Sequence, residues 1–224
     1  MTTVEPGYAD PTSTSTFMPN SKTETNYNMR LATLADAAAV SHLIGSTWSE
    51  FFGYSVSPSD LEHYLATKLS VEGITADLKD PKDVFLVATT TPDATQPQSQ
   101  SQSQPQPSSS SESECSSDSS TIVGVVQLVR DSTEACLTLP KPIELQRLYA
   151  HSSTHGSGLG RLLVEKAEAK GRELGYGSIW LGVWENNESA KRFYEKMGFE
   201  SKGGEHFFFV GESKRRDLIL EKRL

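Results

Sequence analysis

The chain has 224 residues, 36% of them hydrophobic, a length suited to one domain with disordered additions rather than to a stapled mini-protein. Two cysteines exclude a disulfide framework and a zinc site built on several thiolates, and no apolar run is long enough to span a bilayer. Of the formal net charge of −8, residues 1–25 carry −2 and residues 91–120 carry −4, so the rest is nearly neutral, which argues against a nucleic-acid partner.

The N-terminal segment 1–25 is rich in Thr, Ser and Pro and is predicted to be a disordered tail. It has neither the apolar core of a signal peptide nor the arginines of a transit peptide. We therefore expect a cytoplasmic protein without a membrane partner, with a nuclear pool left open. Residues 28–32 are predicted to form a strand, and residues 34–48 follow a helical pattern.

Two features are predicted before the next strand. A helix is expected at 58–70, because Pro58-Ser59-Asp60 is a helix start signal and apolar residues then recur at helical spacing. The aromatic-rich segment 48–54 is predicted to be a loop, which either fills the core or forms a lid against a substrate.

A Ser- and Gln-rich insert at 91–120 separates two β-branched runs, 84–88 and 122–129, which are predicted to pair as a hairpin. The insert holds twelve Ser, six Gln and almost nothing apolar. It cannot offset the roughly 1–2 kcal/mol per residue that ordering a backbone costs. We expect a single domain at 26–224 interrupted by this disordered insert, whose modification or binding role is left open.

The second half alternates strands and helices. A strand is predicted at 143–150, followed by a glycine-rich turn and a helix that ends at Gly175. The remaining predicted elements are a strand at 178–184, a helix at about 187–197 and strands at about 205–210 and 216–223. The fold class is therefore mixed α+β around one sheet.

The glycine-rich turn follows a strand and opens a helix, an arrangement that holds phosphate groups through backbone N–H groups and the helix dipole. The turn reads His155-Gly156-Ser157-Gly158-Leu159-Gly160. It lacks the Gly-Lys-Ser/Thr ending of a triphosphate loop, and its G-x-G-x-G spacing differs from the G-x-G-x-x-G of dinucleotide folds. Tight packing alone is the other interpretation.

Two motifs resemble those of the GNAT superfamily of N-acetyltransferases. The turn resembles the pyrophosphate signature Arg/Gln-x-x-Gly-x-Gly/Ala, with His155 in the first place. The motif N-x-x-A-x-x-hydrophobic-Tyr-x-x-x-Gly-Phe is complete from Asn187 to Phe199. Stretches at 144–149, 179–185 and 204–220 are similar to PaiA-type spermidine/spermine acetyltransferases. The resemblance implies a mostly antiparallel sheet, splayed between its two central strands and flanked by helices.

The resemblance also implies acetyl-CoA as co-substrate and no metal. Coenzyme A would lie where the central strands separate, its pantetheine arm paired with a strand backbone and its pyrophosphate held by the turn. Arg161 would either add positive charge beside the pyrophosphate or remain solvated. Asn187 would either contact the cofactor or cap the helix predicted at about 187–197. The implied cofactor-binding residues are Leu148, Tyr149, Ala150, His155, Gly156, Ser157, Gly158, Leu159, Gly160, Arg161 and Asn187.

Acetyl transfer to an amine needs a base for the ammonium group, whose pKa resembles that of lysine at about 10.4, and an acid for the departing thiolate. The resemblance implies Tyr194 as the acid, with a core tyrosine as the alternative. Glu144 is the predicted base, because burial on a central strand would raise its pKa. The alternative is that Glu144 is a solvated glutamate without a catalytic role. Glu185 or a chain of water molecules is then the next candidate for the base. No His/Asp constellation is recognisable around Cys136, so direct attack in a ternary complex is expected.

The predicted partner is a small-molecule amine, with polyamines favoured. Trp48, Phe52 and Tyr54 would wall the acceptor pocket and attract a cation, with Glu185 beside them. Other carboxylates that could meet a polyamine are Glu50, Asp60, Glu62, Glu144 and Glu205. Another amine, a protein lysine or N-terminus, and a non-catalytic acyl-CoA-binding module are the alternatives. The presence of Tyr194, Glu144 and the turn together favours an enzyme, and a homodimer is compatible with the sequence.

Overall fold

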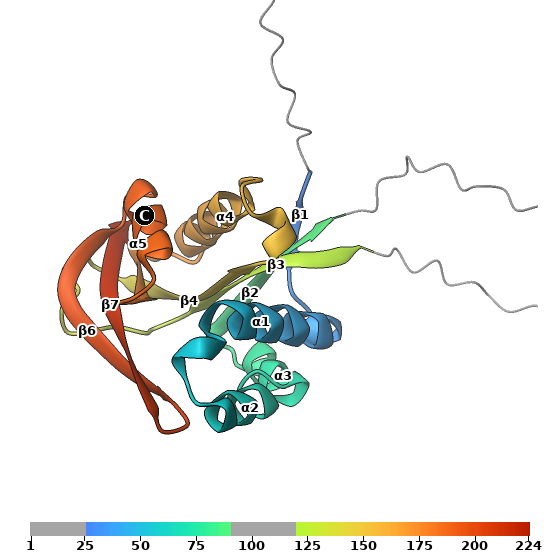
Figure 1. Cartoon of the computed structure of the whole chain (residues 1–224). Coiled ribbons are helices and arrows are strands. Elements are labelled where there is room, and N and C mark those ends of the chain that lie inside the picture. Colours follow the sequence, from blue (N-terminus) through green and yellow to red (C-terminus); the bar gives the residue numbers. More distant parts are fainter. Residues whose placement is uncertain (1–25, 91–119) are drawn as a thin grey trace, which may run out of the picture.

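The computed structural model describes residues 26–90 and 120–224 (Figure 1). The predicted tail at 1–25 and residues 91–119 of the predicted insert lie outside the described residues. Within the two described ranges, no helix is both long and apolar enough to cross a membrane.

The first strand and helix follow the prediction, but the aromatic segment does not. β1 (Asn28–Leu31) leads through a 3₁₀ turn into α1 (Ala37–Phe52). The prediction of a loop at 48–54 was wrong, because Trp48 to Phe52 form the last turn of α1 and Gly53–Ser55 continue as a 3₁₀ turn. The reason is helical spacing: Ile44, Trp48 and Phe52 are four residues apart, and the first two are buried in the core.

The helix predicted at 58–70 ends earlier than expected, as α2 (Pro58–Ala66), and a separate helix, α3 (Val71–Lys79), follows it. Each has its own serine cap. The Ser57 hydroxyl accepts a hydrogen bond from the Asp60 N–H, and the Ser70 hydroxyl accepts one from the Gly73 N–H. The sequence reading missed α3, whose buried Ile74 anchors it to the core.

Seven strands form one sheet in the order β1-β2-β3-β4-β5-β7-β6, and neighbouring strands are antiparallel except β4 and β5. This confirms the mixed α+β class and the mostly antiparallel sheet. Val87 of β2 faces Val125 of β3, as the predicted hairpin requires. The strands after β1 are β2 (Asp83–Thr90), β3 (Thr121–Val129), β4 (Pro142–Ala150), β5 (Ser178–Trp184), β6 (Glu200–Val210) and β7 (Ser213–Arg223).

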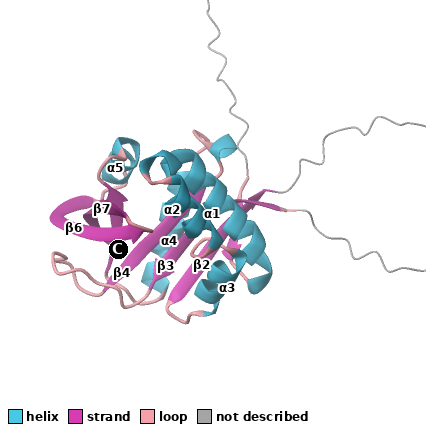
Figure 2. Ribbon diagram, turned by 60° about the horizontal axis from the view of Figure 1, so that its bottom comes forward, coloured by secondary structure: helices cyan, strands magenta, loops and turns pink. Residues whose placement is uncertain are grey.

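Helices cover both faces of the sheet, as Figures 1 and 2 show. α4 (Leu159–Glu173) and α5 (Glu188–Lys196) pack on one face, over a core that includes Leu163, Ile179 and Tyr194. α1 and α3 pack on the other face, over a second core that includes Ile44 and Val125, and α2 lies at its margin. The sheet therefore separates two apolar layers.

The two central strands separate along their length. β4 and β5 pair over only three residues each, from Pro142 opposite Ser178 to Glu144 opposite Trp180, although both strands continue beyond. On the other edge of β4, a register shift leaves Gln146 opposite no residue of β3. Such a bulge bends a strand, which carries β4 away from β5 and opens the sheet at its centre.

Candidate active site

The free edge of β4 presents backbone groups to the opening. The His151 N–H donates to the Val123 carbonyl oxygen of β3 at 2.8 Å, and Tyr149 opposite Val125 lies two residues back in the same ladder. In an antiparallel ladder alternate residues point their N–H and C=O groups away from the partner strand. Leu148 and Ala150 therefore direct theirs into the opening, where an extended chain could pair with them.

The glycine-rich turn continues from the end of β4 to the N-terminus of α4. Gly156 and Gly158 have φ angles of 78° and 89°, a region that favours glycine, and nothing lies within 4 Å of a Cβ built at either position. Within the described part of the chain, the N–H groups of Gly156, Gly158, Gly160 and Arg161 have no hydrogen-bond acceptor. The turn is thus an open cradle of donors that fits the phosphates of coenzyme A.

The side chains of the turn are engaged with their neighbours. The His155 ring lies 5.5 Å from the Phe51 ring at the end of α1. The Arg161 guanidinium pairs with Glu165 on the surface of α4 at 2.8 Å, and the Ser157 hydroxyl accepts a hydrogen bond from Tyr27 at 2.8 Å. The anion-binding capacity of the turn therefore resides in its backbone rather than in these side chains.

Tyr194 lies on the α4–α5 side of the opening. Asn187 caps α5 by accepting a hydrogen bond from the Ala190 N–H at 3.1 Å, as predicted, and this fixes the start of the helix that carries Tyr194. The Tyr194 ring is only 9% exposed and packs between Phe193 and Phe199 at 5.1 and 5.5 Å. Burial raises the pKa of Tyr194 well above its usual value, so the hydroxyl remains protonated at neutral pH.

Glu144 lies on the opposite face, at the closed end of the opening. It belongs to the last residue pair that joins β4 and β5, and it accepts a hydrogen bond from the Ser132 hydroxyl at 2.7 Å. Burial raises the pKa of Glu144, the charges of Glu134 and Asp83 add to this effect, and His206 opposes it. The carboxyl group is therefore less acidic than a solvated one.

The predicted aromatic residues gather around a cation of the chain itself. Trp48 is buried, Phe52 lies edge-on to Trp184 at 5.9 Å, and Tyr54, 78% exposed, lies 6.2 Å from the same ring. The Arg215 guanidinium sits 4.0 Å from the Trp184 ring and 5.5 Å from that of Trp48, and it donates to the Ser55 hydroxyl. Arg215 therefore already makes the cation–π contacts that were expected between these rings and a cationic substrate.

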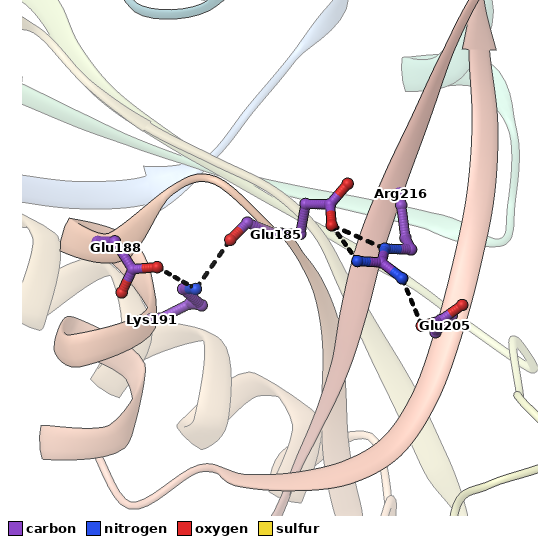
Figure 3. Close-up of polar contacts among 5 residues, drawn as sticks. All are labelled: Glu185, Glu188, Lys191, Glu205 and Arg216. Carbon is purple, nitrogen blue, oxygen red and sulfur yellow. Dashed lines mark hydrogen bonds and ion pairs between the residues drawn. The ribbon is translucent and has the colours of Figure 1, made fainter.

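Most of the carboxylates predicted to contact a polyamine pair with other groups of the chain or face solvent. Arg216 joins Glu185 at the end of β5 to Glu205 of β6, and Lys191 donates to the Glu185 backbone carbonyl (Figure 3). Asp60 accepts hydrogen bonds from the Ser213 hydroxyl and the Glu212 N–H at the β6–β7 turn. Glu50 and Glu62 are exposed on α1 and α2, so Glu144 is the predicted acid that borders the opening.

Two functional candidates escaped the sequence reading, Asp217 on β7 and Gly182 on β5. Asp217 pairs with Trp184, and a Cβ built on Gly182 would lie 3.1 Å from the Asp217 Oδ2 atom. Burial and the charge of Glu185 raise the pKa of Asp217 to about 6, against the opposing charges of Arg215 and His206. No local signal could have found this carboxylate, because its position depends on the register of two strands that are distant in the sequence.

The two faces of the opening thus present complementary groups, a buried phenol from α5 on one side and two carboxyl groups on the other. Burial chiefly raises the pKa of Tyr149 of β4, and the charge of Asp217 adds to this effect. Within the described residues, no group of three His, Cys, Asp or Glu side chains could hold a metal ion. The arrangement provides a proton donor, proton acceptors and a backbone cradle for phosphates.

Comparisons with known proteins agree with this chemistry. A family model described as "Acetyltransferase (GNAT) family" matches residues 84–199. An uncharacterized N-acetyltransferase from Lactobacillus delbrueckii subsp. lactis is 28% identical over 178 residues, covering 80% of this chain and 86% of that protein. One from Mycobacterium bovis is 32% identical over 103 residues, covering 46% of this chain and 61% of that protein.

Among solved structures, the chain is similar to the PaiA N-acetyltransferase from Thermoplasma acidophilum, which was crystallised in complex with coenzyme A. The TM-score is 0.61 at 19% sequence identity, and the match covers 89% of this chain and 99% of that protein. At this identity, the likeness shows a shared fold.

Proposed function

Since this chain belongs to the GNAT acetyltransferase family, we propose that it transfers the acetyl group of acetyl-CoA to the primary amine of a small polyamine such as spermidine. The family-level activity is an acetyl-CoA-dependent N-acetyltransferase reaction. The polyamine acceptor and direct attack in a ternary complex are the finer parts of the proposal.

The observation that carries the choice of a cationic acceptor is the pair of carboxyl groups at the opening. Glu144 comes from β4 and Asp217 from β7, and the register of β4, β5 and β7 places both on the α1–α3 face of the sheet. A polyamine offers several cations to such a site, whereas a neutral amine offers none.

The backbone groups at the opening support the proposed grip on acetyl-CoA. Leu148 and Ala150 would pair with the pantetheine arm, and the N–H groups of Gly156, Gly158, Gly160 and Arg161 would bind the pyrophosphate. Asn187 would contact the cofactor in addition to its role as a cap. The thioester of acetyl-CoA supplies an acetyl group that is activated toward attack by an amine.

Two proton transfers complete the proposed reaction. A carboxylate at the opening takes a proton from the acceptor's ammonium group, and Glu144 and Asp217 are the candidates. Tyr194, which burial keeps protonated at neutral pH, donates to the departing sulfur. Holding both reactants in line supplies on the order of 7–11 kcal/mol of the barrier reduction in systems of this kind.

The test is the initial rate of coenzyme A release from acetyl-CoA with spermidine, for the wild-type chain and Tyr194→Phe. Saturable spermidine turnover, reduced at least about tenfold in the variant, is the expected result. Tyr176→Phe is the matched control, because the Tyr176 hydroxyl contacts Asp131 rather than the opening.

The result also separates the alternatives. Acetyl-CoA binding without spermidine turnover would refute the polyamine acceptor, and a panel of other amines and lysine peptides would then identify the acceptor class. Binding of acetyl-CoA without turnover of any amine would instead favour a non-catalytic acyl-CoA-binding module.

A further inference from the structure

The middle of β5 is exposed at Gly182, on the sheet face that α1 and α3 cover. Leu181 and Val183 of this strand are buried against the opposite core, whereas Gly182 between them is exposed. The exposure of Gly182 means that side chains do not fully cover this face of the strand. One edge of β5 also borders the opening between β4 and β5, so the exposed part of this strand adjoins the opening.

Asp217 lies beside Gly182 on this face. Its backbone pairs with that of Trp184, so the two side chains share a face, and a Cβ on Gly182 would lie 3.1 Å from both the Cβ and the Oδ2 atoms of Asp217. The carboxyl group is therefore directed from β7 toward Gly182 of β5. A side chain at position 182 would crowd this carboxyl group.

The Asp217 carboxyl group is also unoccupied. Its Oδ1 atom is buried and has no hydrogen-bond partner among the described residues, and no ion pair within 4 Å holds the side chain there. A buried carboxylate oxygen without a partner is costly, which makes it a site for a donor that arrives with a ligand.

Glu144 differs from Asp217 both in its position and in its hydrogen bonding. It lies in the last paired residues of β4 and β5, below the point where the strands separate, and the Ser132 hydroxyl already donates to it. Ser132 is itself fixed, because its carbonyl oxygen accepts a hydrogen bond from the Trp180 indole at 3.1 Å. The glutamate is therefore engaged, whereas the aspartate is free.

We propose that Asp217 is the residue that binds the acceptor's ammonium group and takes its proton, and that Gly182 is required to give the amine access to it. This inference rests on the proposed amine acetylation. The proton passes from the ammonium nitrogen to the Asp217 carboxylate, and the neutral amine then bonds to the acetyl carbon as the carbon–sulfur bond breaks. The sulfur takes a proton from Tyr194, the amide nitrogen gives up its second proton to restore Tyr194, and Asp217 releases its proton to solvent.

The charges around Asp217 set the pH range in which it can act. Arg215 on the same strand and His206 on β6 lower its pKa, while Glu185 at the end of β5 raises it. Burial chiefly raises the pKa of Tyr149 of β4 and of Tyr64 of α2, and the charge of Asp217 adds to both effects. With burial as the largest effect, the pKa of about 6 leaves Asp217 ionised at neutral pH and basic enough to accept a proton.

The experiment measures kcat/KM for the amine against pH, with the full chain and saturating acetyl-CoA. For the wild type we expect kcat/KM to rise up to about pH 6 and then remain level until the amine loses its own proton near pH 10. Asp217→Asn should reduce kcat/KM by about 100-fold at pH 7.5. The kcat/KM of this variant should show no level region and should keep rising toward pH 10, because without the Asp217 carboxylate only the neutral amine reacts.

Two further variants guard against a merely structural effect. Glu144→Gln removes the other candidate base and should keep the level region above pH 6, whatever its effect on the size of kcat/KM. Gly182→Ala retains the carboxylate but places a methyl group 3.1 Å from it, and should lower kcat/KM about tenfold while the acetyl-CoA affinity stays unchanged.

A wild-type profile in Asp217→Asn, or loss of the level region in Glu144→Gln alone, would overturn the assignment while leaving the acetyltransferase activity intact. If the wild-type chain acetylates no amine in a broad panel, the proposed function fails, and the role of Asp217 fails with it. The two failures are distinguishable because only the second abolishes wild-type turnover.

Discussion

Removing the charge of Asp217 should stabilise the fold at neutral pH. The pKa of this carboxyl group is raised from 3.8 to about 6, chiefly by burial. Between these two pH values, the native state holds a proton that the unfolded chain has lost. The free energy of unfolding of the wild type therefore falls as the pH rises from about 4 to about 6, and it stays lower above that range.

The size of the effect follows from the same values. At about 1.4 kcal/mol per pH unit, the difference between 3.8 and about 6 corresponds to about 3 kcal/mol. The carboxyl group is partly exposed, so solvent screening reduces this figure. We expect Asp217→Asn to exceed the wild type by about 1–3 kcal/mol at pH 8 and to match it at pH 4.

Urea unfolding followed by tryptophan fluorescence at pH 4, 6 and 8 measures this difference. Asp36→Asn is the control of opposite sign, because two hydrogen bonds from Arg30, each 2.8 Å long, help to lower the pKa of Asp36 to about 2. The stabilisation due to Asp36 is present above about pH 4 and is lost as the pH falls through about 2, so this variant should be less stable than the wild type at pH 8. An advantage of Asp217→Asn that does not grow between pH 4 and pH 8 would refute the reasoning.

Three other predictions concern the glycine turn, the cap of α5 and the core. Gly158→Ala and Gly175→Ala both place a Cβ at a positive φ angle, 89° and 84°, and each should cost about 1–2 kcal/mol of stability. Only Gly158→Ala should weaken acetyl-CoA binding, at least about tenfold by calorimetry, since Gly175 lies at the far end of α4; equal affinities would exclude the turn as the phosphate cradle. Asn187→Ala should cost about 1 kcal/mol in thermal unfolding by removing the hydrogen bond to the Ala190 N–H, and an unchanged melting temperature would show that the cap contributes nothing. Leu163→Ala should cost about 2–5 kcal/mol in urea unfolding because the side chain is fully buried between α4 and the sheet; a loss below about 1 kcal/mol would mean that the core closes over the cavity.

The sequence by itself predicted the elements whose signals are local. The β-branched runs at 84–88 and 122–129 pair in the structure despite the long insert between them, because strand propensity depends on the residues of each run. Asn187 caps α5 and the glycine-rich turn opens α4, since caps and positive φ angles are set by residues close in sequence. The family and its acetyl-transfer chemistry followed from these same short motifs.

Local signals were insufficient where several helical patterns adjoin. The segment 48–54 was predicted to be a loop, yet Trp48 and Phe52 continue the apolar face of α1. The second serine cap at Ser70 was not recognised as the start of α3. In both cases, packing against the sheet decides where the helix ends.

Only the tertiary structure determined which side chains meet at the opening. The β5–β7 register places Asp217 beside Gly182, and the same strand brings Arg215 under the aromatic rings that the sequence had suggested for a substrate. A shift of one residue in that register would move these side chains to the other face of the sheet. Register is fixed by the burial of whole strands against two cores rather than by any one motif, and for that reason the acceptor side of the site could not be read from the sequence.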